Sequence, residues 1–219
     1  MKRPSPTIYF RLPAMEFESA NPSVVKSIRQ RVLLNSWLRA CENERTLPGL
    51  DRFQPEDIAD ELPDMMGFAV DACGESFRFF ITQEGARLTT TYGCEHLTPE
   101  QRINRYLDDA LGPARYARVV PGYLACVSHR RPTYSISLVH DIDGKEVAFE
   151  RLLLPFGGDG VEHIIGSYKS ISIEGAFQAA NLMGPDAPCA PVPVINTVIS
   201  LETTRQSAIR AGDEVIEAG

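Results

Sequence analysis

The chain has 219 residues, enough for one medium-sized domain with arms or for two small domains. Hydrophobic residues make up 43% and charged residues 23%, as in an ordinary globular protein that can bury a core. The formal net charge is −7, and no Lys/Arg cluster is longer than the pair Arg130-Arg131. Because nucleic-acid binding needs a basic surface, this composition argues against a nucleic-acid partner.

The cysteines and the lack of long apolar segments predict a location inside the cell. The five cysteines are scattered without a CxxC pair, so we interpret them as reduced thiols. The N-terminus carries two positive charges, but the apolar stretch of a signal peptide does not follow. No apolar run approaches the ~20 residues that span a bilayer. We expect a soluble, cytoplasmic protein with no membrane partner.

The first 45 residues are predicted to form an irregular arm and then a helix. Residues 1–20 contain three prolines and show little periodicity. At Asn21-Pro22-Ser23 a capping residue is followed by proline, which is typical of the first turn of a helix. We therefore assign residues 21–45 to one helix.

The apolar residues of this helix change face halfway along it. At about 100° per residue, two groups lie on nearly opposite faces. They are Val25, Ile28 and Val32, and then Leu34, Trp37, Leu38 and Cys41. Such a helix needs two partners, its own sheet and a second copy of the chain, so it is a predicted dimerisation element. A kink or break near Leu34 is the alternative.

The segment 46–183 has the pattern of an α+β core. Five runs rich in β-branched and aromatic residues predict strands. They are Met66–Val70, Phe77–Ile81, Tyr134–His140, Glu146–Phe156 and Val161–Ser172. Short turns containing Asp-Gly join the last three as an antiparallel meander. Between the second and third strands we predict helices at 85–93, 98–111 and 114–129, the last kinked or split by Pro121.

The C-terminal part is predicted to be a tail. A last short helix is expected at 174–183. From Gly184 onward prolines accumulate, and the chain finishes with the acidic run 213–217. We interpret residues 184–219 as a mobile or docked tail that is not a domain.

Several short motifs in this order point to one known fold. They are Trp37 with Leu47-Pro48, Leu62-Pro63, Phe77-Arg78-Phe79, Gly85-Ala86-Arg87-Leu88, Tyr92-Gly93, Arg131-Pro132-Thr133-Tyr134 and Glu150-Arg151-Leu152-Leu153-Leu154-Pro155-Phe156. Over about residues 30–183 the chain resembles a bacterial family of compact, mostly stand-alone PAS proteins. The resemblance implies a PAS-like five-stranded antiparallel sheet with short helices on one face. It also implies a sensory or ligand-binding role, often in a homodimer formed through a helix before the core, and it implies no reaction.

The cofactor-binding versions of the PAS fold do not match this chain. The flavin photosensors of the PAS fold need an Asn-Cys-Arg-Phe-Leu-Gln run on the helix after the second strand. In this chain Cys94 lacks the Asn, Arg, Phe and Gln partners of that run. Haem sensors of the fold use a His on a long helix before the third strand, and the helix at 100–111 contains none. We predict no cofactor. No His/Cys spacing matches a metal site, so no metal is expected either.

Arg151 is the charged residue that most needs an explanation. Alternation along its strand places it on the face of Val147, Phe149 and Leu153, among apolar neighbours. A charge in such a place must be paired or exposed. Arg151 could hold a carboxylate ligand between the sheet and the helices. The alternative is a structural ion pair with a helix carboxylate such as Asp108 or Asp109.

Four further residues complete the predicted ligand-binding set. Arg87 and Tyr92 lie where the cavity of a PAS fold would be lined, and Tyr123 is on the apolar stripe of its helix. A cavity with phenols and an arginine suits a small acidic or polar-aromatic ligand. His163 lies on a strand and could share a sheet face with His140. The alternative for all of these residues is an ordinary core or surface role.

The sequence therefore predicts a non-catalytic sensory or regulatory module that binds a small molecule or a protein partner. No kinase, cyclase or DNA-binding segment follows residue 183, so the signal is expected to pass to another chain. Two rival hypotheses remain. One is an isomerase or hydrolase that uses Arg151, His163 and Tyr123, and a titratable base beside an empty space would favour it. The other is a structural adaptor, which a solid core would favour.

Overall fold

A single sheet of seven strands organises the chain. The computed structural model describes residues 15–19, 22–41, 46–74, 76–93, 98–184, 187 and 189–200. In sheet order the strands are β1 (Met15–Ser19), β7 (Val192–Ile199), β4 (Thr133–His140), β5 (Glu146–Gly157), β6 (Val161–Ile171), β2 (Met65–Cys73) and β3 (Ser76–Glu84). Neighbours are antiparallel, except that β1 is parallel to β7. The α+β class is confirmed, but the sheet has two strands more than the five predicted.

The five predicted strands are β2 to β6, and local chemistry explains their turns. Between β4 and β5, the Asp141 carboxylate accepts hydrogen bonds from the backbone N–H groups of Asp143 and Lys145 at 3.0 and 2.9 Å. Gly144 follows with φ of +80°, which favours glycine. The strands β2 and β6 pair directly, so the first and last of the five lie side by side.

The two additional strands correct the predictions for both ends of the chain. The segment assigned to a tail contains β7, which pairs with β4, and the arm assigned as irregular contains β1. In β7, Pro193 has no N–H to donate, and it lies beside the register shift of this pair. The proline suggested a tail, although the β-branched residues around it fit a strand. Residues 1–14 and 201–219 lie outside the described ranges.

One face of the sheet is covered by four helices. They are α2 (Leu88–Tyr92), α3 (Pro99–Arg102), α4 (Leu107–Ala110) and α5 (Pro113–His129). The predicted helix 98–111 is divided because residues 104–106 run along the edge strand β3. There Ile81 donates its N–H to the Arg105 carbonyl at 2.8 Å and accepts one from Asn104 at 2.9 Å. Pro121 lies inside α5 and does not split it, and residues 174–183 are irregular where a helix was predicted.

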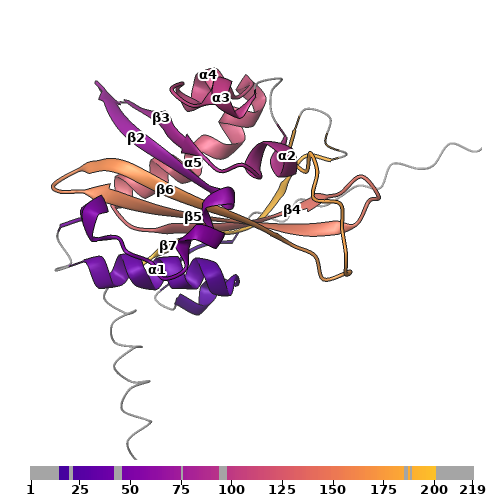
Figure 1. The fold of residues 1–219 in the computed structure, drawn as a ribbon, viewed down its shortest axis with the longest axis horizontal. Coiled ribbons are helices and arrows are strands. Elements are labelled where there is room, and N and C mark those ends of the chain that lie inside the picture. The colour runs from indigo at the N-terminus through magenta and orange to yellow at the C-terminus, as the bar shows by residue number, and fades with distance from the viewer. Residues whose placement is uncertain are drawn as a thin grey trace, which may run out of the picture.

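The opposite face is covered by α1 (Ile28–Ala40) and by the short 3-10 turns η1 (Pro22–Val24), η2 (Leu50–Arg52), η3 (Ile58–Asp60) and η4 (Leu62–Asp64). Figure 1 shows α1 below the sheet and α3 and α4 above it. Ser27 caps α1 by accepting a hydrogen bond from the N–H of Gln30. Val25 is buried before this cap, whereas Ile28 and Val32 inside the helix are exposed. The helix runs without a break past Leu34, so the predicted break there is wrong.

The sheet therefore separates two apolar cores. Alternate residues of β5 point to opposite sides: Val147, Phe149 and Leu153 join the core under α2 to α5, whereas Leu152, Leu154 and Phe156 join the core under α1. Among the residues that the structure describes, no helix combines the length and apolar character needed to cross a bilayer.

Candidate ligand-binding site

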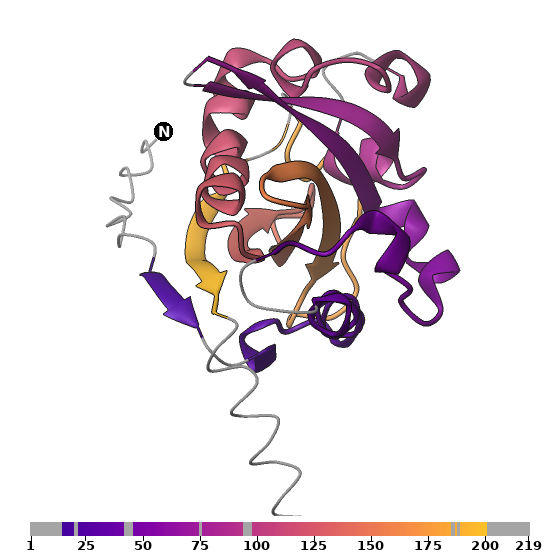
Figure 2. The same cartoon turned by 90° about the vertical axis from the view of Figure 1, so that its left-hand side faces the viewer.

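A groove of about 520 Å³ lies between α5 and the strands β4, β5 and β7. Figure 2 shows α5 beside the yellow strand β7. Residues of β7 also line the groove. From α5 the lining takes Arg115, Arg118, Val119, Pro121, Gly122, Ala125 and His129. Apart from Pro121, these positions recur at helical spacing, so one face of the helix supplies most of the roof of the groove.

The floor of the groove contains a polar row that crosses four strands. Ser135 on β4 lies opposite Asn196 on β7 and Arg151 on β5, and Arg151 lies opposite Tyr168 on β6. Directly opposed residues of antiparallel strands point to the same face. The row therefore runs beneath α5 from the groove towards the interior, with Arg151 in the middle.

Arg151 is held by α5 and not by an acid. Its Nη1 donates to the Val119 carbonyl oxygen at 3.2 Å, and its guanidinium carbon lies 5.5 Å from the centre of the Tyr123 ring. Gly122 makes the close approach possible, because a Cβ there would collide with Nη2 of Arg151. Both of these contacts with the Arg151 side chain come from residues of α5. We therefore expect the helix and the guanidinium group to move together.

The predicted ion pair of Arg151 with Asp108 or Asp109 is wrong. Arg78 on β3 binds these two carboxylates, with Nη2 to oxygen distances of 2.9 and 3.1 Å. The groove lining contains Arg115, Arg118, Arg151 and His129, and no Asp or Glu occurs among the described residues that line it. In a chain whose formal net charge is −7, this is a basic hollow that suits an anion.

A second, inner cavity of about 50 Å³ lies deeper under the helices. Arg115, Val119, Arg151 and Met183 line both spaces and so form the partition between them. Arg115 is buried and donates to the backbone carbonyls of Gly93 and Tyr92 at 3.0 and 3.1 Å. The partition therefore presents two guanidinium groups, and each donates to backbone carbonyls.

Buried phenols line the inner cavity. The hydroxyls of Tyr123 and Tyr168 lie 2.6 Å apart, and Tyr92 accepts a hydrogen bond from the Ser170 hydroxyl at 3.1 Å. Burial raises the pKa of Tyr92, Tyr123 and Tyr168, so all three stay protonated at neutral pH. The predicted residues Tyr92, Tyr123 and Arg151 are thus brought together around the same space.

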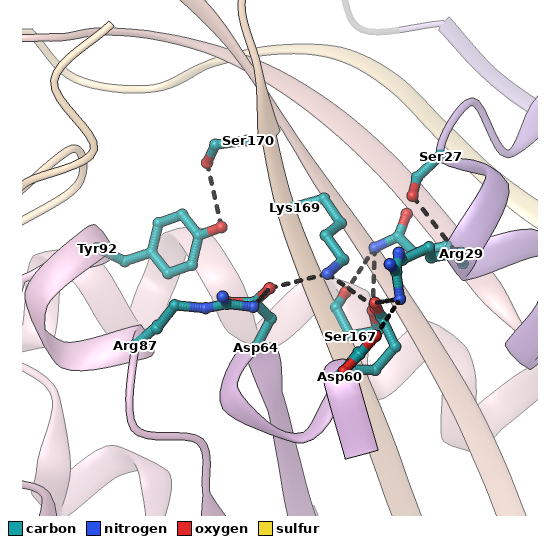
Figure 3. Close-up of polar contacts among 11 residues, drawn as sticks. Ser27, Arg29, Asp60, Asp64, Arg87, Tyr92, Ser167, Lys169 and Ser170 are labelled. Atoms are coloured by element: carbon teal, nitrogen blue, oxygen red, sulfur yellow. Dashed lines mark hydrogen bonds and ion pairs between the residues drawn. The ribbon is translucent and has the colours of Figure 1, made fainter. Parts of the chain in front are cut away.

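Arg87, also predicted for the site, lies elsewhere. It pairs with Asp64 through two hydrogen bonds of 2.9 and 2.6 Å (Figure 3). It lines neither space. Lys169 on β6 reaches the same carboxylate at 2.8 Å and Glu61 at 2.7 Å. This charged network fastens the turn η4 to the sheet, so the role of Arg87 in this structure is to hold that turn.

His163 is also outside the site. It lies on β6 opposite Ala69 and Phe156, and neither the groove nor the inner cavity includes it. The histidine that does line the groove is His129, at the exposed end of α5. Alternation along β6 shows why: Ile164 and Tyr168 point under α5, and His163 points to the other face.

Arg115, Ser135 and Asn196 are among the polar lining residues that the sequence did not point to. Arg115 had a signal, because it lies four residues before Val119 on the apolar stripe of its helix and a charge there needs a partner. Ser135 and Asn196 had none: small polar residues on a strand are common, and the segment of Asn196 was assigned to a tail. Their relevance appears only when β7 pairs with β4.

No protein-family model, curated protein or solved structure matches this chain. The function must therefore be argued from the two spaces under α5 and from the residues that line them.

Proposed function

We propose that this chain is a non-catalytic sensory or regulatory module of the PAS type, which binds a small molecule in the groove under α5 and passes the signal to another chain. The observation that carries the proposal is the groove itself. Its volume of about 520 Å³ falls in the range typical of small-molecule sites. A lining of apolar side chains with a few convergent polar groups is also typical of such sites.

The arrangement of β2 to β6 supports the PAS part of the proposal. These strands form an antiparallel sheet, and the helices α2 to α5, which lie between its second and third strands in the chain, cover one face. The strands β1 and β7 extend this sheet next to β4. In our proposal the extension serves the ligand, since β7 contributes Asn196 and Val198 to the groove.

The lining favours binding over catalysis. The enzyme hypothesis named Arg151, His163 and Tyr123, but His163 lies outside the groove and Tyr123 is a protonated phenol bonded to Tyr168. The remaining base is His129, on the exposed end of α5 and away from the partition. The open groove also favours a ligand-binding module over an adaptor with a solid core.

The signal would pass through α5. Its carbonyl groups at Val119 and Gly122 accept hydrogen bonds from Arg151 and Thr133, which belong to the groove floor. A ligand that engages Arg151 would weaken or re-aim the first of these contacts and so change how α5 packs on the sheet. Binding can shift such an equilibrium only by its differential affinity for the two positions of the helix.

Native mass spectrometry of the freshly purified full chain tests the binding proposal. We expect a species heavier than the chain by the mass of a small molecule, which denaturing conditions release. A panel of small acids should also raise the melting temperature, because a ligand that binds only the folded state stabilises it. Bare chain alone, together with no stabilisation by any acid at millimolar concentration, would contradict the proposal.

The homodimer remains part of the proposal and needs a separate test. Ile28 and Val32 on α1 are 71% and 36% exposed, on the side that faces away from the sheet. Removing α1 would destroy a core, since Trp37 is fully buried, so point changes are preferable. We expect Ile28→Ser with Val32→Ser to yield a monomer in light scattering, with Ile142→Ser, also on an exposed isoleucine, as the control. A wild-type monomer, or a dimer that survives the double change, would refute this interface.

A further inference from the structure

The position of Arg151 narrows the class of ligand. Arg151 lines both the groove and the inner cavity, so a group bound to it lies at the junction of the two spaces. Within the described part of the chain its guanidinium makes one hydrogen bond, to the Val119 carbonyl, and has no carboxylate partner. Since a guanidinium has five N–H donors in a planar fork, it can still bind a carboxylate with two parallel hydrogen bonds.

The phenol pair behind Arg151 offers a further donor. Tyr123 and Tyr168 share one hydrogen bond at 2.6 Å, which uses one of their two hydroxyl protons. The second proton remains, in a site where both side chains are buried. A buried donor is stabilised by an acceptor, and the register of β5 with β6 places Tyr168 directly beside Arg151. The junction therefore offers a charged fork and a neutral donor to one acidic group.

The rest of the groove suits an apolar body. Val119, Ala125, Phe149, Pro193 and Val198 line it, and no carboxylate occurs among its described lining residues to repel an acid. The inner cavity of about 50 Å³ is large enough for a carboxylate or a few waters and too small for the body of a ligand. The ligand would thus enter head first, with its acidic end at Arg151.

We infer that the groove takes a monocarboxylic acid with an apolar body, whose carboxylate binds Arg151 at the partition. The inference rests on the proposed function and adds the chemical class of the ligand. Arg118 at the groove edge is exposed and would serve only to attract the acid. Arg151 would determine specificity, because a neutral analogue leaves its fork and the phenol donor without an acceptor.

Isothermal titration of the full chain with octanoate and with octanamide tests this inference. We expect octanoate to bind at least about tenfold more tightly, since a bidentate charged pair replaces neutral hydrogen bonds. Arg151→Gln should reduce this ratio to about one, whereas the matched control Arg105→Gln, at an exposed arginine that lines neither space, should leave the ratio unchanged. Equal affinities in the wild type, or a ratio that Arg151→Gln does not change, would overturn the inference.

Further arms separate the possible failures. The wild-type ratio is decisive even if Arg151→Gln does not fold, and Arg151→Lys, which keeps the charge without the fork, should lower the ratio without abolishing it. An unchanged ratio in Arg151→Lys would assign the acid to another group. If inorganic phosphate binds more tightly than octanoate, the ligand class is a free oxyanion and not a monocarboxylic acid. Octanamide equal to octanoate would overturn this inference alone, whereas binding of neither probe, with no retained molecule, would overturn the proposed function too.

Discussion

The two faces of the sheet are formed by the same strands but differ in how they are covered. Under α1 the core is packed solid around Trp37, whose indole N–H donates to the Pro155 carbonyl at 2.6 Å. Under α5 the corresponding space is hollow and holds arginines and phenols. On the α1 side the buried carboxylate of Glu150 is hydrogen-bonded within the chain, although Gln30 Oε1 and Arg31 Nε on α1 have no hydrogen-bond partner among the described residues. On the α5 side Arg151 donates one hydrogen bond, to a backbone carbonyl, within the described part of the chain. The difference teaches that one face of this sheet carries a closed apolar core, whereas the other contains a groove that our proposal assigns to a ligand.

Glu150 and Arg151 show the contrast at neighbouring positions. Glu150 points to α1 and accepts hydrogen bonds from the Tyr134 hydroxyl at 2.7 Å and the Ser27 N–H at 3.0 Å. Arg151 points to α5 and is bound by a backbone carbonyl. These neighbouring residues on β5 thus lie on opposite faces of the sheet. The Glu150 carboxylate is hydrogen-bonded within the chain, whereas the Arg151 guanidinium keeps N–H donors available.

The largest loss of stability is expected from removing a large side chain from the core under α1. Trp37→Ala removes a fully buried side chain and its hydrogen bond, and we expect a loss of about 3–5 kcal/mol in the free energy of unfolding. Urea denaturation followed by circular dichroism measures this. Asn35→Ala, at an exposed position of the same helix, is the control and should change stability by less than about 0.5 kcal/mol. A loss below about 1 kcal/mol for Trp37→Ala would show that this face is not tightly packed.

A matched pair of hydroxyl deletions compares the faces directly. Tyr134→Phe removes a donor to the buried carboxylate of Glu150, so we expect a loss of about 1.5–3 kcal/mol. Tyr123→Phe breaks a bond between two neutral phenols and should cost about 0.5–1.5 kcal/mol. Both changes keep the ring and its packing. If Tyr123→Phe were the more costly in urea denaturation, the phenol pair would be a structural element and not a ligand site.

Gly122→Ala should affect binding more than stability. The new methyl would displace the flexible guanidinium of Arg151, while alanine favours the helix by up to about 1 kcal/mol. We expect unfolding free energy within about 1 kcal/mol of wild type and octanoate binding weakened roughly tenfold. Gly85→Ala is the contrasting variant, because its methyl would strike the rigid carbonyls of Leu62 and Pro63 and destabilise the fold. If Gly122→Ala binds octanoate as tightly as the wild type, Gly122 does not contribute to the site.

The smallest effect concerns acid stability. Burial of Asp64 acts to raise its pKa, but hydrogen bonds from Arg87 and Lys169 outweigh this and lower the pKa below its usual value. A carboxyl with a lowered folded pKa stabilises the fold above its unfolded pKa, near 3.9, and this contribution disappears as the pH falls through the folded pKa. Asp64→Asn should therefore cost about 1 kcal/mol or less at pH 7 and flatten the loss of stability below about pH 4.

Glu84 provides the control of opposite sign. Its burial raises the pKa, and the nearby Arg102 only partly offsets this. A raised folded pKa means that protonation favours the folded state, so lowering the pH through that pKa stabilises this position. Glu84→Gln should remove that gain, in contrast to Asp64→Asn. If urea midpoints of both variants varied with pH as the wild type does, neither carboxyl would control acid stability.

Some of the candidate site was predictable and some was not. Arg151 was identified because strand alternation places its charge among apolar residues. Tyr123 was identified because helical spacing places it on the apolar stripe of its helix. Arg87 and His163 were predicted for the site but lie outside it, since one is held by Asp64 and the other points to the opposite face. Neither fact can be read from local spacing, because both depend on which distant segment packs against the residue.

The sequence by itself determined the strands β2 to β6 and their turns, because side-chain alternation and Asp-Gly turns act over a few residues. It also determined the buried stripe of α5. Tertiary structure alone decided that β7 and β1 extend the sheet, that Gly122 admits Arg151 to the surface of α5, and that Asp108 and Asp109 pair with Arg78. These contacts join segments tens of residues apart, and their register is set by the packing of the whole sheet, which no local pattern encodes.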